Sequence, residues 1–444
     1  MAWTTLLKSF SQCSAMTGIS RIAGLCRDMV FAHFFGASAG FDAFLVAFQV
    51  PSFMRRIFAE GAMSQAFVPV FKTYQVNASL DRQRAVINGA LGTLLLSVLV
   101  VTVCICAMAP WVIHLYAPGF AVEGDPRFVL AVRLLYWTFP YLPFLALIAF
   151  FSALLNCYRR FLVTSAIPII LNVSLILGAL WGHMKGSIVP LAMCVPIAGA
   201  LQVLCLGCHM RRVCGPVWPT WGVRDPAVRR MWKLMSGAVF GVSVAQIGLV
   251  VDTFLASFLP HGSVSWLYFS QRLVFLPLGL FGVAAATVIL PRLSEARTEA
   301  LHSQTLSWAV SIVLVLGVPA AGGLIMLAKP ILATLFLYGA FDAQDLLMTQ
   351  RSLMALALGL PAFMLIKIFA SGFYAQQDIK TPVRYGVYGL GLNVVLCLIL
   401  MKFLAHAGLA LAGAMSAWFQ AVLLGVRLLK TVGGFLEYPG TFKI

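Results

Sequence analysis

The chain has 444 residues, of which 61% are hydrophobic and only 10% are charged, and its mean hydropathy is +0.94. Soluble domains carry about 25% charged residues, so this composition excludes an ordinary soluble protein and indicates an integral membrane protein. The formal net charge is +17, but most basic residues lie between apolar stretches, where they signal orientation in a membrane and require no nucleic-acid partner.

Long apolar stretches recur along the chain and predict transmembrane helices. A helix needs about 20 apolar residues to cross a bilayer, and the runs Gly92–Ala109, Phe161–Leu180 and Ser307–Leu327 are of that order. We therefore predict an all-α integral membrane protein with about twelve transmembrane helices. In chain order, the predicted spans are 11–35, 42–71, 86–109, 128–156, 161–182, 187–210, 236–258, 264–291, 305–328, 352–374, 383–403 and 408–429.

The two halves of the sequence resemble each other. Pro140 matches Pro361, and Asn172 in LNVSLIL matches Asn393 in LNVVLCL at the same spacing. Six predicted spans fall in each half, so the halves are expected to be parallel repeats that pack as two lobes around a central pathway. The predicted domains are an N-terminal lobe at 1–210, a cytoplasmic linker at 211–235 and a C-terminal lobe at 236–444.

The distribution of basic residues predicts the orientation. With the N-terminus placed in the cytoplasm, nineteen Lys and Arg residues fall on the inner side and four on the outer side. Cytoplasmic loops of membrane proteins carry this excess. Both termini and the 211–235 linker are therefore predicted to be cytoplasmic.

The sequence offers little enzyme chemistry. Cys205, Cys208 and His209 form a C-x-x-C-H pattern that is formally typical of haem attachment. The pattern lies at the end of an apolar helix, so we interpret its cysteines as small hydrophobic residues. Because no metal-ligand cluster, nucleophile or phosphate-binding loop is evident, we expect a protein that is not an enzyme and holds no organic cofactor or structural metal.

Charged residues inside the predicted spans are the most informative feature. Arg21, Arg55 and Arg272 lie near the middle of the bilayer. Each costs about 2.5–3.5 kcal/mol at the centre of a helix, so they are expected to face a wet cavity, a counter-charge or an anionic ligand. The alternative is a set of ion pairs between helices, and the spacing of Arg56 and Glu60 suits a local pair on one helix.

The segments around these charges carry a family resemblance. They read SRIAGLCRD (20–28), FDAFLVAFQVPSFMRRIFAEGAMSQAFVPVF (41–71), GSVSWLYFSQRLVFLPLGLFGVA (262–284) and GFYAQQDIKTPV (372–383). They resemble the MurJ (MviN) lipid II flippases of the multidrug/oligosaccharidyl-lipid/polysaccharide exporter superfamily. The resemblance implies a two-lobe bundle in a bacterial inner membrane. It also implies a function in peptidoglycan synthesis, in which lipid II, the undecaprenyl-diphosphate-linked disaccharide-pentapeptide, is moved outward by alternating access.

The resemblance also assigns roles to residues. Guanidinium groups suit a diphosphate because they bind its oxygens in several directions. Gln49, Gln271 and Phe275 depart from charged residues that are frequent in the family, and members usually have two more C-terminal helices. The implied substrate-binding residues are Ser20, Arg21, Arg27, Arg55 and Arg272, and the implied gating or structural charges are Asp28, Asp42, Arg56 and Glu60.

The sequence leaves two alternatives for the force that drives transport. Some members of the resembled family bind sodium in the second lobe, where Asp252 and Asn393 occupy the corresponding helices. These two residues are a candidate cation site, although a hydrogen-bonded structural role for Asp252 is the alternative. The membrane potential could instead act directly on the anionic headgroup, at about 2.3 kcal/mol per charge per 100 mV.

Two other transport functions remain open at this point. A flippase for another polyprenyl-diphosphate glycan would share a cationic cavity but lack the 41–71 signature. A cation-coupled multidrug exporter of the same superfamily would carry acids in its cavity in place of arginines. A scaffold with no transport function is disfavoured because it gives no reason to place arginines at mid-membrane. The expected partners are lipid II and the surrounding membrane lipids.

Overall fold

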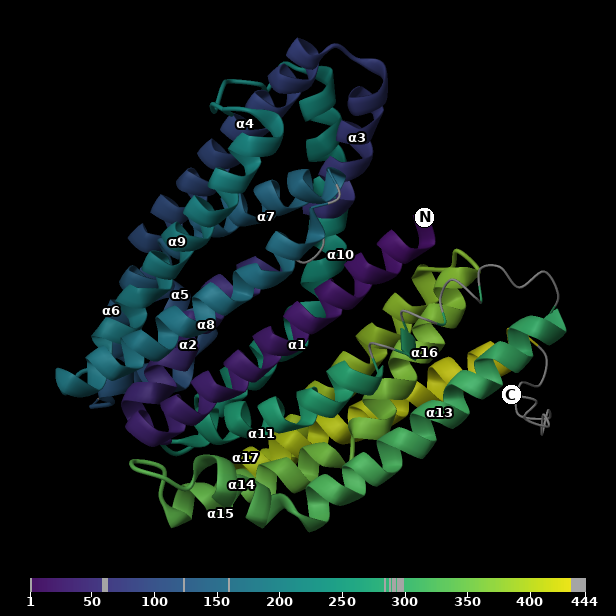
Figure 1. The fold of residues 1–444 in the computed structure, drawn as a ribbon. Coiled ribbons are helices and arrows are strands. Elements are labelled where there is room, and N and C mark those ends of the chain that lie inside the picture. The colour runs from purple at the N-terminus through teal and green to yellow at the C-terminus, as the bar shows by residue number, and fades with distance from the viewer. Residues whose placement is uncertain are drawn as a thin grey trace. The chain divides into compact units, whose positions relative to one another are not determined.

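The computed structural model describes residues 2–57, 63–122, 124–158, 160–282, 285, 286, 289, 293 and 299–432. Every regular element in these ranges is a helix (Figure 1), which confirms the predicted all-α class. The chain divides into two compact units, Met1–Val250 and Val251–Ile444. The division falls within one continuous helix, α10.

The first unit contains nine complete helices longer than one turn among its described residues and most of α10. Its α1 packs along α8, α8 packs along α9, and α2 packs against α6. The bounds are α1 Ala2–Phe35, α2 Ala39–Ile57, α3 Met63–Asn77, α4 Leu80–Ala107, α5 Ala109–Tyr116, α6 Pro126–Thr138, α7 Tyr141–Cys157, α8 Phe161–Met184, α9 Val189–Cys214 and α10 Pro226–Ala256, with a 3-10 turn η2 at Pro118–Ala121.

The second unit repeats part of this order. A long helix is followed by a short one in both units, α4 by α5 and α13 by α14. Within the unit α11 packs against α15, and α16 packs against α17 and α13. The bounds are α11 Ser263–Pro277, a π-helical turn η3 at Leu278–Gly282, α13 Glu299–Met326, α14 Ala328–Phe336, α15 Ala343–Ala357, α16 Leu360–Ala375 and α17 Lys380–Val432.

The predicted spans fall on these helices, with three differences in continuity. Seven described helical stretches are long and apolar enough to cross a membrane, and α6 with α7, bent by 41°, form an eighth candidate. The predicted span 42–71 comprises α2 and α3, with residues 58–62 between them outside the described part. The predicted span 352–374 covers the end of α15 and nearly all of α16. The last two predicted spans, by contrast, lie on either side of the break in α17 at Ala405, where φ is 48°. The count of twelve stays a prediction.

A proline in α2 explains one contact between helices. Pro51 has no N–H, so it cannot donate to the carbonyl of Ala47 one turn earlier. The hydroxyl of Thr138 on α6 donates to that carbonyl at 3.3 Å. A backbone carbonyl that lacks its helical partner requires another donor inside a membrane. The Thr138 hydroxyl takes the place of the missing N–H and thereby links α2 to α6.

The segment that leads from α9 into α10 is bound closely to α4, and we call residues 215–225 the strap. Arg82 donates to both carboxylate oxygens of Asp225 at 2.6 and 3.0 Å. The Thr220 amide donates to the carbonyl of Asn88 at 3.1 Å. Burial opposes ionisation of Asp225, but the hydrogen bonds from Arg82 and from the Ala227 amide outweigh it and lower the pKa of that carboxyl group.

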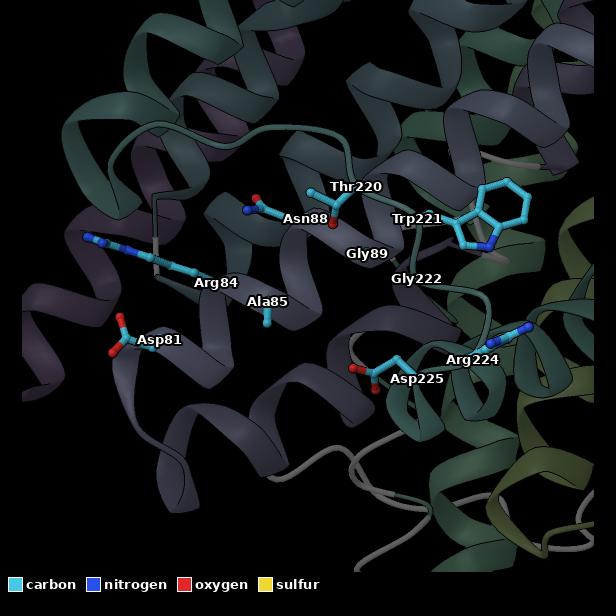
Figure 2. A pocket seen from close by; sticks show the side chains of 10 residues that line it. All are labelled: Asp81, Arg84, Ala85, Asn88, Gly89, Thr220, Trp221, Gly222, Arg224 and Asp225. Atoms are coloured by element: carbon cyan, nitrogen blue, oxygen red, sulfur yellow. The ribbon is translucent and has the colours of Figure 1, made fainter.

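Glycines allow the strap to lie against the α4 backbone. A Cβ on Gly92 would collide with backbone atoms of Thr220, and one on Gly222 would collide with the backbone of Gly89. Figure 2 shows Thr220 and Gly222 beside the part of α4 that carries Gly89. These residues line a cavity of about 580 Å³. The first turn of α10 then packs through Ala227 against α3 and α4.

Gly92→Ala is therefore expected to destabilise the protein. In most helices a Gly-to-Ala change stabilises by up to about 1 kcal/mol, but overpacking against Thr220 costs about 1–3 kcal/mol. The matched control is Gly322→Ala on α13, where nothing lies within 4 Å of an added Cβ. Thermal unfolding of the purified protein in detergent should show a lower midpoint for Gly92→Ala and an equal or higher one for Gly322→Ala. Equal midpoints for the two variants would refute the close packing of the strap.

Candidate functional site

The predicted substrate-binding residues lie on three helices. Ser20, Arg21 and Arg27 are on α1, Arg55 is in the last turn of α2, and Arg272 is on α11. Arg21 is exposed, Arg55 and Arg272 are half-buried, and Arg27 is buried. The first four belong to the first unit and Arg272 to the second, so their convergence on one cavity stays a prediction.

Arg27 is held in a buried cluster between α1 and α8. Its Nε and Nη2 donate to Oδ1 of Asp28 at 3.0 and 2.6 Å, and its Nη1 donates to Oδ1 of Asn172 at 2.9 Å. The guanidinium also lies over the ring of Phe31, 5.5 Å from its centre. Asp28 is 2% exposed, so the arginine supplies the counter-charge that a buried carboxylate requires. Three nitrogen atoms are thus engaged within the first unit.

The second predicted charge group lies at the end of α2. Arg56 donates through Nη1 to Oε1 of Gln246 on α10 at 2.8 Å. Nearby, Nε2 of Gln49 donates to the carbonyl of Leu249 at 3.3 Å, so a second contact joins α2 and α10. The predicted pair of Arg56 with Glu60 cannot be placed, because Glu60 lies outside the described residues.

Asp42 belongs to a buried charge cluster that the sequence analysis did not identify. Asp42 is fully buried in the first turn of α2, and Nη1 of Arg127 lies 3.8 Å from its Oδ2. Arg127 also pairs with Asp125 at 2.7 Å and lies over Phe120, 4.2 Å from the ring centre. Arg127 is one of the four basic residues counted on the outer side of the predicted topology. The D-P-R spacing at 125–127 signals a local pair, but nothing in the sequence links it to Asp42.

The second unit carries the other predicted residues. Nη2 of Arg272 donates to the hydroxyl of Tyr268 at 3.2 Å, one turn earlier on α11, and its Cζ lies 4.7 Å from the centre of that ring. Asp252 near the end of α10 accepts a long hydrogen bond of 3.4 Å from Nδ2 of Asn393 on α17. Oδ1 of Asn393 accepts from the thiol of Cys397 at 3.7 Å. The two residues of the candidate cation site thus lie in contact.

Comparison with known proteins identifies the family. The family described as "Lipid II flippase MurJ" matches residues 31–440. A probable lipid II flippase MurJ of Vibrio cholerae is 45% identical, with 94% of this chain and 82% of the relative covered. The chain belongs to the lipid II flippase MurJ family. A lipid II flippase MurJ of Burkholderia cenocepacia is 37% identical, with 99% of this chain and 86% of the relative covered.

Solved structures agree with this membership. A lipid II flippase MurJ in an inward closed conformation matches with a TM-score of 0.82 at 27% identity, covering 97% of this chain and 93% of that one. An inward-facing MATE multidrug transporter of the MOP superfamily matches with a TM-score of 0.76 at 14% identity, covering 95% and 96%. The second likeness shows the fold alone. The predicted MurJ family, and with it a transporter in place of an enzyme, is confirmed.

Proposed function

We propose that this chain moves lipid II from the cytoplasmic to the outer leaflet of a bacterial inner membrane by alternating access. Its family supports lipid II as the substrate. The observation that carries the mechanism is the placement of arginines on membrane helices, with Arg21 exposed and Arg55 and Arg272 half-buried. Side chains of this kind are costly in lipid, and an anionic diphosphate is a ligand that offsets that cost.

The arginines differ in how firmly they are held. Arg27 is fixed by Asp28 and Asn172, whereas Arg21 is exposed on the same helix two turns earlier. Arg272 is oriented by the Tyr268 hydroxyl. We assign Arg21, Arg55 and Arg272 to direct contact with the diphosphate, and Arg27, which Asp28 neutralises, to the packing that holds this part of α1 in place. Release on the outer side then requires that the two lobes separate these groups.

We also propose that both termini and the strap face the cytoplasm. The bias of nineteen to four basic residues supports this orientation. Part of that bias comes from two exposed basic groups that the strap joins, one containing Arg211 and Arg212 and the other Arg229 and Arg230. Lipid II is made available on the cytoplasmic side in this scheme, and its headgroup enters the cavity there.

The driving force is proposed to act on the second unit through a monovalent cation at Asp252 and Asn393. The pair brings a carboxylate on α10 and an amide on α17 together. The amide nitrogen faces Asp252 and the amide oxygen faces Cys397, so the amide would turn over to bind a cation. The carboxylate and the amide oxygen are hard donors of the kind that such cations bind, and a ligand with different affinity for two conformations shifts their populations. An acid in a membrane helix is a functional candidate by default.

The first prediction from this proposal concerns the arginines. In proteoliposomes with fluorescent lipid II, Arg21→Ala, Arg55→Ala and Arg272→Ala should each slow translocation at least about tenfold, because a hydrogen bond to a charged group contributes about 1.5–3 kcal/mol. Lys at these positions should not restore the parent rate, since a point charge cannot replace the planar fork. The control is Arg212→Ala, an exposed residue at the end of α9. Parent-like rates for all three variants would overturn the assignment.

The second prediction concerns coupling. Translocation by the parent protein should speed up severalfold when sodium replaces choline, and Asp252→Asn should remove that response while leaving the protein folded. The amide of the variant keeps a hydrogen-bonding partner for Asn393 but loses the charge that attracts a cation. If the variant translocates as fast as the parent and sodium changes neither, Asp252 is structural and the membrane potential acts on the headgroup directly.

A further inference from the structure

Asn172 bridges two points of α1 that lie two helical turns apart. The side chain is 6% exposed and projects from α8. Its Nδ2 donates to the carbonyl of Ser20 at 3.2 Å, and its Oδ1 accepts from Nη1 of Arg27 at 2.9 Å. Gly24 lies between the two points, and an added Cβ there would have Asn172 Nδ2 as its nearest neighbour at 3.8 Å. One amide thus holds both ends of the segment that carries Arg21 and Arg27.

Few side chains can make this bridge. It requires a donor and an acceptor on one short planar group, which Asn, the longer Gln and the larger neutral His provide. An apolar residue would leave the Nη1 edge of a buried guanidinium without this acceptor, and such losses are costly at low dielectric. An aspartate could accept from Arg27 but could not donate to the Ser20 carbonyl.

The internal repeat shows what is particular to the first unit. The sequence GLCRD at 24–28 has a counterpart in GLVVD at 248–252, so Asp28 corresponds to Asp252, while Val251 stands where the first copy has Arg27. In the second unit Asn393 donates directly to Asp252. In the first unit the guanidinium of Arg27 contacts both the acid and the asparagine. Each unit therefore places an acid and an amide close together, and in the first unit an arginine bridges them.

We propose that Asn172 is a positioning residue for lipid II. It orients the Arg27 guanidinium against Asp28 and thereby sets the stretch of α1 that presents Arg21 to the diphosphate. This inference rests on the proposed function. It goes beyond that function because it assigns a role in substrate affinity to a neutral residue on α8. That residue does not contact the substrate and acts only by positioning the arginines.

The test measures lipid II binding by native mass spectrometry of the purified protein, with thermal unfolding recorded for each variant. Asn172→Leu should weaken binding about tenfold, the effect of losing one hydrogen bond to a charged group. The control is Gln202→Leu on α9, which removes another buried amide of the same unit, one that bonds Tyr141 and the Ile167 carbonyl. That variant should lower the unfolding midpoint comparably and change affinity less than about twofold.

A second pair of variants distinguishes a positioning role of Asn172 from a purely structural one. Arg27→Met with Asp28→Asn removes the ion pair without stranding a buried charge. In that background Asn172→Leu should have no further effect on lipid II affinity, because the residue acts through Arg27, and residues that act as a unit are not additive. An equal additional loss in both backgrounds, or parent-like affinity of Asn172→Leu alone, would overturn the inference. If the parent itself does not bind lipid II, the proposed function fails instead.

Discussion

The cost of holding a positive charge in an apolar environment governs how this protein is built. In the first unit that cost is met in two buried clusters, where Arg27 pairs with Asp28 and Arg127 pairs with Asp125 near Asp42. Arg21 is exposed on α1 at the same time. The unit therefore neutralises some of its arginines internally and presents another outward, which is the arrangement that an anionic lipid headgroup requires.

The two units share part of their helix order but differ in charge at one place. The acid and amide at Asp28 and Asn172 recur as Asp252 and Asn393, and the arginine does not. In our account the first unit has a permanent cation there, while the second is open to an exchangeable one. We propose that this asymmetry gives the two units separate tasks, with headgroup recognition centred on the first and the response to a driving ion assigned to the second.

The sequence predicted helix locations, fold class and family because these depend on local hydropathy and on contiguous motifs. It could not predict the contacts that organise the charges. Asn172 and Arg27 are far apart in the chain, as are Arg127 and Asp42, and one sequence gives no information on such pairing. The two predicted spans 383–403 and 408–429 correctly leave a gap at Ala405, where α17 breaks. The left-handed backbone conformation of Ala405 itself could not be predicted from the sequence.

The central claim is that arginines of both units bind one diphosphate. A double-mutant cycle on lipid II affinity, with Arg21→Ala in the first unit and Arg272→Ala in the second, tests it most directly. Two side chains that contact the same ligand should show a coupling of about 0.5–3 kcal/mol between the single losses. Additive losses within about 0.5 kcal/mol, or no loss of affinity in one of the single variants, would mean that the two arginines do not share a ligand and would contradict the account.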